Sequence, residues 1–336
     1  KASSYGIGKA EVVSVLQYNH VDYLTVAYSD EGVELRRNGI TLPIMVMNPE
    51  EQSFDDIIQY DLEPDIYSFR ILELFSRTVS FFGKRGRRVP IHVEFDTGMH
   101  RLGFGEQDLP ELASRLSDAE CPLEVRSIFS HLACSEDAAM DDFTNLQISR
   151  FRSWSDRLKR DMKRDDIWCH ILNSSGIVRF PEAQMDMVRL GIGLYGVPTC
   201  EADKNFLQPV VSLKTTINQI KNIPAGDSIG YNRHGRAEKD MRIGIIPIGY
   251  ADGLSRLLGN GNGKFYINGQ QVKVIGDICM DMCMLDLTDV EAQEGDTVVI
   301  FDAEHSIFDI AKACQTIPYE IMTSISQRVK RIYYQE

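Results

Sequence analysis

Hydrophobic positions follow two patterns in the first part of the chain. Up to about residue 205, short apolar runs alternate with stretches in which apolar residues recur every three or four positions. The runs predict buried parallel strands, and the periodic stretches predict amphipathic helices. The clearest helical stripe contains Ile148, Phe151, Trp154, Leu158 and Met162. The predicted strands are Asp22–Tyr28, Thr41–Met47, Asp65–Phe69, Val89–Phe95, Leu123–His131, Ile167–Leu172 and Met187–Tyr195.

Strand–helix alternation repeated seven times predicts an α/β fold, either a (β/α)8 TIM barrel or a doubly wound sheet. We favour the barrel, because polar residues stand where several apolar runs end, and barrel enzymes carry their chemistry at the carboxyl ends of their strands. The eighth strand would then end at Lys1. We assign residues 1–207 to this domain.

The pattern changes after residue 207, where strands follow one another without long helices between them. Asn268-Gly269 between two alternating runs predicts a tight hairpin. We assign residues 208–336 to a mostly antiparallel β domain with a short helix at Ser306–Cys314. Its predicted strands are Pro209–Ile217, Met241–Ile248, Lys264–Ile267, Gln271–Ile275, Ile278–Leu287, Asp296–Phe301 and Arg328–Tyr334.

Charge and composition narrow the function classes. The chain has 336 residues with 49 acidic and 36 basic side chains, a net charge of −13. This balance argues against nucleic acid and anionic membranes as partners, and no apolar stretch is long enough for a membrane span. Seven scattered cysteines without zinc-ligand spacing predict free thiols in a cytoplasmic protein without a metal site.

Groups suited to catalysis stand at the ends of the predicted strands. Lys1 at such an end can form an imine with an aldehyde if burial lowers its pKa, and Arg101 suits a carboxylate or phosphate. His131 has the chemistry of a base, although a buried structural histidine fits equally well. The segment Arg189–Gly196 places glycines in an apolar run, which suggests close approach of a ligand to the backbone.

Other candidates are individually ambiguous. Asn173-Ser174 ends a strand but also fits a helix cap. In the second domain, Tyr231, Tyr250 and Cys279-Met280-Asp281 are polar positions at strand ends.

Taken in order, these segments resemble the alanine racemases, which interconvert L- and D-alanine with pyridoxal 5'-phosphate (PLP). The resemblance spans nearly the whole chain and rests on KASSYGIG, DTGMHRLGF, HLACSED, LNSSGIVRFPE, MVRLGIGLYG, IGYNR, IPIGYADG, GDICMDMCMLDLTD and PYEIMTSISQRVKRIYY. It implies a PLP-binding (β/α)8 barrel followed by a β domain. It also implies a homodimer in which one chain's barrel and the other chain's β domain share each active site, and a role in supplying D-alanine for peptidoglycan.

The resemblance also assigns roles to residues. Lys1 would hold PLP as an imine, and Tyr231 from the partner chain would be the second base. The implied cofactor contacts are Tyr5, Ser174, Gly191 and Ile192 at the phosphate and Arg189 at the pyridine nitrogen. His131 would orient Tyr231, and Arg101 with the Met280 backbone would hold the substrate carboxylate. The pocket would be lined by Asn173, Tyr250, Cys279 and Asp281.

Elementary chemistry agrees with these roles. Racemisation removes a proton from one face of Cα and returns one to the other, so two bases are needed, and an amine and a phenol must both be tuned toward neutrality. An arginine at the pyridine nitrogen keeps its own proton, so the ring nitrogen stays neutral and transamination is disfavoured.

The chain departs from the family pattern at three places. Glu94 replaces a lysine that can be carbamylated in many members, so we expect no carbamate and a direct pairing of Glu94 with Arg101. Gln327 replaces a tyrosine that reaches the phosphate in some members. The chain opens at Lys1 without an initiator methionine, so the expected first strand, and in some bacteria a fused cell-wall ligase domain, would lie upstream.

Three other functions remain open from the sequence. A racemase of serine or of broader specificity is one, because the sequence does not reveal pocket size. A PLP decarboxylase is a second, although Arg189 argues against it. A non-catalytic PLP-carrying barrel is the third, although such barrels lack the β domain that brings Tyr231 and Met280.

Overall fold

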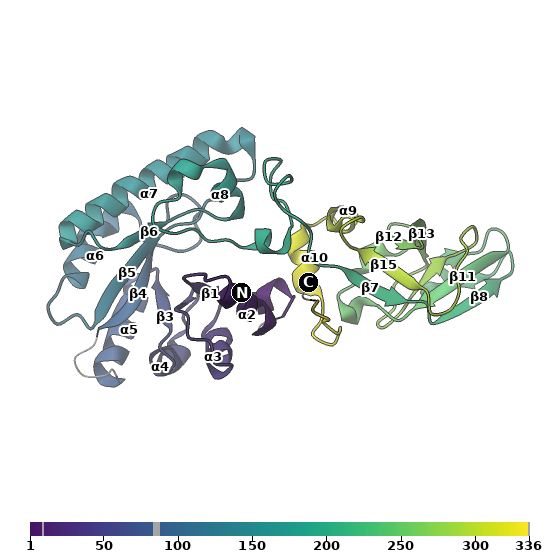
Figure 1. Cartoon of the computed structure of the whole chain (residues 1–336), viewed down its shortest axis with the longest axis horizontal. Coiled ribbons are helices and arrows are strands. Elements are labelled where there is room, and N and C mark those ends of the chain that lie inside the picture. The colour runs from purple at the N-terminus through teal and green to yellow at the C-terminus, as the bar shows by residue number, and fades with distance from the viewer. Residues whose placement is uncertain (9, 83–87, 335–336) are drawn as a thin grey trace. The chain divides into compact units, whose positions relative to one another are not determined.

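The computed structural model describes residues 1–8, 10–82 and 88–334. The chain divides into two compact units, which are described separately below. The first unit comprises Lys1–Ala2, Lys9–Leu194 and Pro198–Leu207. The second comprises Ser3–Gly8, Tyr195–Val197 and Gln208–Glu336. A short segment near the start of the chain and another past its middle therefore belong to the unit that is otherwise formed by Gln208–Glu336 (Figure 1).

The first unit is built on six parallel strands that pair in sequence order, from β1 to β6. Each strand pairs in parallel with the next one along the chain, and helices connect them. This confirms six of the predicted strands and the α/β class. The strands are β1 Leu24–Val26, β2 Ile44–Val46, β3 Glu63–Ile66, β4 Val89–Glu94, β5 Leu123–Phe129 and β6 Trp168–His170.

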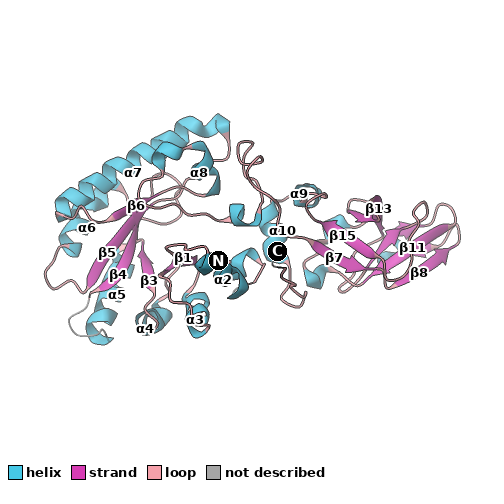
Figure 2. Ribbon diagram, viewed as in Figure 1, coloured by secondary structure: helices cyan, strands magenta, loops and turns pink. Residues whose placement is uncertain are grey.

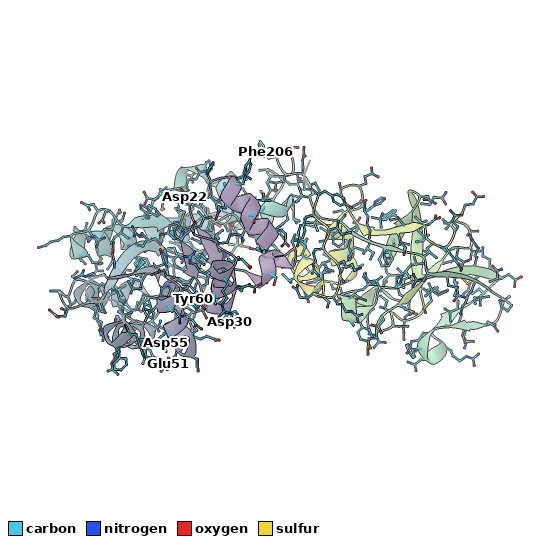
Figure 3. The ribbon with its side chains drawn as sticks, turned by 60° about the horizontal axis from the view of Figure 1, so that its bottom comes forward. Asp22, Asp30, Glu51, Asp55, Tyr60 and Phe206 are labelled. Atoms are coloured by element: carbon cyan, nitrogen blue, oxygen red, sulfur yellow. The ribbon has the colours of Figure 1, made fainter. Side chains whose placement is uncertain are left out.

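Helices cover the outer side of this sheet, as Figure 2 shows. The longest, α7 (Asp141–Met162), buries Ile148, Phe151, Trp154 and Leu158 from the predicted stripe, while Pro110 stands in the first turn of α6 (Leu109–Leu116), where it costs no hydrogen bond. The outward side is polar, with Asp30, Glu51 and Asp55 exposed (Figure 3). The remaining helices of this unit are α2 Ala10–Tyr18, α3 Ser29–Arg37, α4 Phe54–Gln59, α5 Phe69–Phe82 and α8 Ser174–Arg179, whereas α1 Ala2–Tyr5 belongs mostly to the second unit.

The predicted strand at Met187–Tyr195 is wrong. The segment contains a 3-10 turn at Ile192–Tyr195 instead. Its start is held by Ser174, whose hydroxyl accepts hydrogen bonds from the N–H groups of Gly191 (3.0 Å) and Gly193 (3.3 Å). These N–H groups therefore point to a side chain and are unavailable for a strand ladder.

The second unit contains an antiparallel seven-stranded sheet with the order β7-β15-β12-β13-β14-β11-β8. The predicted hairpin joins β12 to β13 in register, and Asn268 (φ 50°) and Gly269 (φ 76°) form its turn. The strands and helices are β7 Leu213–Thr216, β8 Gln219–Ile223, β9 Ser228–Ile229, β10 Gly235–Arg236, β11 Met241–Ile246, β12 Lys264–Ile267, β13 Gln270–Ile275, β14 Cys283–Asp286, β15 Thr297–Phe301, α9 Ile307–Ala313 and α10 Pro318–Ser324.

The predicted last strand at Arg328–Tyr334 is also wrong, because this segment is irregular. Arg331 donates hydrogen bonds to the carbonyls of Gly6, Ile325 and Val329, so a side chain, and not a strand ladder, ties the segment down. Among residues 1–8, 10–82 and 88–334, no helix combines the length and apolar character needed to cross a bilayer.

Candidate active site

Lys1 lies in a cluster of charged side chains at one edge of the first unit's sheet. Lys1 is exposed as a residue, yet protein atoms surround its ammonium group. Burial, followed by the positive charges of Arg189 and Arg101, lowers its pKa to about 8. Glu94 and Asp65 oppose the shift. Lys1 is therefore tuned toward an amine that is partly unprotonated near neutral pH.

Arg189 is held by neutral acceptors. Its Nη2 donates to the backbone carbonyls of Ser130 (2.5 Å) and Ile171 (3.2 Å), and its Nη1 donates to Nδ1 of His170. The guanidinium carbon lies 5.2 Å from the ring centroid of Phe129. Burial lowers the pKa of Arg189 to about 10, so the group remains charged at neutral pH.

Both histidines beside Arg189 are neutral at physiological pH. Burial and the charges of Arg189, Arg101 and Lys1 lower the pKa of His131 to about 3. Burial and the neighbouring Arg189 also lower the pKa of His170. The two imidazoles therefore add no positive charge to the cluster.

Two buried carboxyl groups face this cluster from neighbouring strands. Asp65 on β3 is 0% exposed and Glu94 on β4 is 3% exposed, and the charge of Glu94 acts on Asp65. No N–H or hydroxyl of the described residues donates to either Asp65 oxygen. Two buried carboxylates close to each other repel, so the pair favours a state in which one group carries a proton. Burial and the charge of Glu94 raise the pKa of Asp65, so we place the proton there.

This arrangement corrects the expected pairing of Glu94 with Arg101. Within the described part of the chain, no salt bridge joins these two residues. Arg101 attracts Glu94 only at longer range. The charge of Glu94 instead acts on Asp65, which lies on the neighbouring strand.

Ser174 and the 3-10 turn beside it form a small set of donors. Ser174 opens α8, and the Asn173 side chain caps this helix by accepting from the Gly176 N–H at 3.0 Å. Ile192 opens the 3-10 turn, so its N–H has no partner within that turn. A hydroxyl and the backbone N–H groups of Gly191, Ile192 and Gly193 thus gather at one place.

Tyr5 belongs to the second unit and follows an unusual backbone. Ala2, Ser3, Ser4 and Tyr5 all have positive φ, between 47° and 58°. The Tyr5 ring packs against Tyr195 (5.6 Å between centroids) and Tyr319 (5.9 Å). This packing fixes the position of the phenol despite the strained turn that carries it.

Tyr231 stands on a short turn in the second unit. The residue opens a 3-10 turn, is 66% exposed, and follows Gly230, whose φ is 78°. The end of the turn is fixed by His234, whose Nδ1 lies 2.9 Å from a carboxylate oxygen of Asp277. Asp277 also accepts from Asn260 at 2.8 Å. The turn is thereby tied to the segment that leads to Cys279, Met280 and Asp281.

A second loop packs on that segment. The N–H groups of Tyr250 and Ala251 donate to the carbonyls of Cys279 (3.0 Å) and Met280 (2.9 Å). A Cβ at Gly249 would lie 2.3 Å from the Cys279 carbonyl oxygen, so only glycine fits there. Four predicted site residues, Tyr250, Cys279, Met280 and Asp281, are therefore close together.

Two sequence profiles of one known family match the chain. The sequence profile described as "Alanine racemase, N-terminal domain" matches residues 1–199, and "Alanine racemase, C-terminal domain" matches residues 210–333. The chain belongs to the alanine racemase family. The predicted resemblance is thus confirmed over both parts of the chain.

Individual alanine racemases are similar to this chain along most of their length. The chain is 38% identical to alanine racemase 2 of Caldanaerobacter subterraneus subsp. tengcongensis, over 99% of this chain and 86% of that protein. Its structure is similar to that of alanine racemase from Streptomyces lavendulae, with a TM-score of 0.92 and 29% identity over 100% of this chain and 89% of that one. These similarities confirm the barrel-plus-β-domain fold class.

A further solved structure bears on the cofactor. Alanine racemase from Bartonella henselae, with covalently bound pyridoxal phosphate, matches with a TM-score of 0.88 and 29% identity, over 99% of this chain and 90% of that chain. The donor set of this chain fits such a group: an amine with a lowered pKa, a buried guanidinium, and a hydroxyl with backbone N–H groups suited to a phosphate.

Several polar residues that contact or neighbour the predicted site residues of each unit were missed from the sequence. Asp65, His170 and Asp277 are polar side chains inside apolar strands or directly after one, and their polarity there was the available signal. Asp252 and Arg328 were missed for a different reason. Arg328 bridges Asp252 (2.7 Å) and Asp281 (2.6 Å) from a segment far along the chain, which no local pattern predicts.

Proposed function

We propose that the protein is a PLP-dependent alanine racemase (EC 5.1.1.1) that interconverts L- and D-alanine. One observation carries the proposal. Lys1, whose pKa is lowered to about 8, lies within the influence of Arg189, a buried guanidinium that remains charged. Family membership supports the same reaction.

The cofactor would be held by residues of the barrel and of the short N-terminal segment. Lys1 would bind it covalently, and Ser174, Gly191, Ile192 and Tyr5 would donate to its phosphate. When bound, PLP supplies the electron sink that makes the Cα proton of an amino acid acidic.

Proton transfer at Cα would then be divided between two side chains. Lys1 would serve one face of the carbon, and Tyr231 of a partner subunit would serve the other. His131 would orient Tyr231 as a neutral imidazole, which its low pKa permits. Two bases on opposite faces are what inversion requires.

Arg189 favours racemisation over decarboxylation. At neutral pH it offers a donor that keeps its own proton, because its pKa of about 10 lies well above that range. An acidic group at this place would instead accept a hydrogen bond from a protonated ring nitrogen and support the stronger electron withdrawal typical of decarboxylases.

The substrate would be bound between a cation and a backbone donor. Arg101 and the Met280 N–H would take the carboxylate, and Tyr250, Cys279, Asp281 and Asn173 would line the pocket. Because Tyr231 and Met280 would come from the second chain, the enzyme would work as a homodimer. We place its role in the cytoplasm, where it would supply D-alanine for peptidoglycan.

The test is incubation of the protein with PLP and L-alanine in D2O, followed by NMR and chiral analysis. We expect D-alanine that carries deuterium at Cα. Loss of carbon dioxide would indicate a decarboxylase, and absence of Cα exchange would indicate a PLP carrier. Parallel incubation with L-serine distinguishes an alanine racemase from one of broader specificity.

A further inference from the structure

A continuous chain of polar side chains crosses the interior of the first unit. Starting at Arg189, it passes through His170 on β6, Ser127 on β5 and His92 on β4 to Glu63 on β3. The distances from His170 onward are 2.9 Å, 2.6 Å and 2.9 Å. Tyr23 closes the chain by donating to the same Glu63 oxygen at 3.0 Å. The chain therefore links four neighbouring strands to the cation of the candidate active site.

With both imidazoles neutral, the two ends of this chain fix the direction of every hydrogen bond in it. Arginine is a donor only, so Nδ1 of His170 accepts, and a neutral His170 must carry its proton on Nε2. His170 therefore donates to the Ser127 hydroxyl, which in turn donates to Nδ1 of His92. His92 then carries its proton on Nε2 and donates to the acceptor-only carboxylate of Glu63.

Burial of the side chains stabilises these hydrogen-bond directions. His92, Ser127 and His170 are all 0% exposed, so no solvent competes for their hydrogen bonds. Burial acts to raise the pKa of Glu63, but the hydrogen bonds from His92 and Tyr23 and the charge of Arg126 outweigh it and lower the pKa. Glu63 is therefore an anion at neutral pH, and hydrogen bonds aligned in one direction strengthen each other.

We propose that Glu63 is a positioning residue for Arg189, acting through His92, Ser127 and His170, and that the chain holds both histidines as Nε2–H tautomers. The Glu63 carboxylate strengthens each acceptor along the chain in turn. Nδ1 of His170 therefore accepts a stronger hydrogen bond from Nη1 of Arg189, and this bond fixes the plane of the guanidinium. This inference extends the proposed racemase function, because it assigns a role to residues that touch neither cofactor nor substrate.

The first test measures the tautomers and does not depend on activity. In the 15N-labelled protein, NMR of the imidazole nitrogens should show His92 and His170 protonated on Nε2 and bare on Nδ1. Replacing Glu63 with Gln should shift the Nδ1 resonance of His170, three side chains away, while Glu51→Gln in the exposed 3-10 turn before α4 should not (Figure 3). A proton on Nδ1 of either histidine overturns the proposal, whether or not the protein racemises alanine.

The second test uses a matched pair at the middle of the chain. Ser127→Ala removes the hydroxyl, whereas Ser127→Thr keeps it. In the PLP-loaded protein we expect Ser127→Ala and Glu63→Gln to lower kcat about 10-fold with little change in KM, and Ser127→Thr to recover most of the loss. Equal activity of Ser127→Ala and wild type, both folded by circular dichroism, contradicts the role. If Ser127→Ala does not fold, the tautomer measurement on the wild type still decides.

Discussion

Asp65 and Glu94 are two buried carboxyl groups on neighbouring strands, and the charge of Glu94 acts on Asp65. Burial and this charge raise the pKa of Asp65, which favours its protonated form. Folding therefore takes up a proton at neutral pH, because an unfolded aspartate is ionised above pH ~4. The stability contributed by the protonated form is full below the unfolded pKa and falls as the pH rises toward the folded pKa.

Asp65→Asn mimics the protonated form without needing a proton. We expect it to raise the free energy of unfolding at pH 7.5 by about 1–3 kcal/mol and to lose this advantage near pH 4. Denaturant unfolding at both pH values measures the difference. The exposed Asp55→Asn is the control and should match wild type at both. A destabilised Asp65→Asn at pH 7.5 would show that Asp65 is ionised in the native protein.

The lowered pKa of Lys1 predicts how the cofactor-free protein captures PLP. Only the unprotonated amine attacks an aldehyde, and with a pKa of about 8 roughly one tenth of Lys1 is in that form at pH 7. The capture rate, followed by absorbance, should rise with pH through about 8 and then level off. Borohydride reduction followed by peptide mapping should place the label on Lys1, and Lys1→Ala should remain unlabelled. A label on another lysine contradicts the assignment.

The shared active site predicts complementation between inactive subunits. Lys1→Ala and Tyr231→Phe chains should each be inactive alone. After mixing and subunit exchange, a heterodimer holds one site with both residues intact, so about one quarter of wild-type activity should return. Native mass spectrometry confirms the exchange. No recovery in verified heterodimers would place Lys1 and Tyr231 of the same chain in one site.

Much of the fold was predictable because its core follows simple periodicity. The stripe from Ile148 to Leu158 and the turn at Asn268-Gly269 are local signals, and the structure has both. The strand predicted at Met187–Tyr195 failed because Gly191 and Gly193 donate to Ser174, a contact that apolar periodicity does not encode. The strand β8 (Gln219–Ile223) was missed because no residue in it is fully buried, so it lacks the alternation that marks a strand.

Candidate site residues that belong to a sequence motif were predicted. Residues that come together only through the packing of distant segments were missed. Arg101, His131 and Arg189 stand close to the ends of apolar runs, and in the structure the positive charges of Lys1, Arg101 and Arg189 act on one another and on the neutral His131. The chain through Ser127 and His92 gave a weaker signal, namely polar residues at buried positions of neighbouring strands. Recognising it required the strand register, which pairs His92 with Ser127.

In the proposed reaction, Lys1 and Tyr231 act on opposite faces of Cα of the substrate. The most direct measurement is Cα deuterium exchange of L- and D-alanine, each followed separately by NMR in D2O with the PLP-loaded Tyr231→Phe variant. We expect that one enantiomer, the one whose proton Lys1 removes, still exchanges without inversion, while the other is at least ~100-fold slower and racemisation is lost. Equal exchange of both enantiomers with continued racemisation would contradict it.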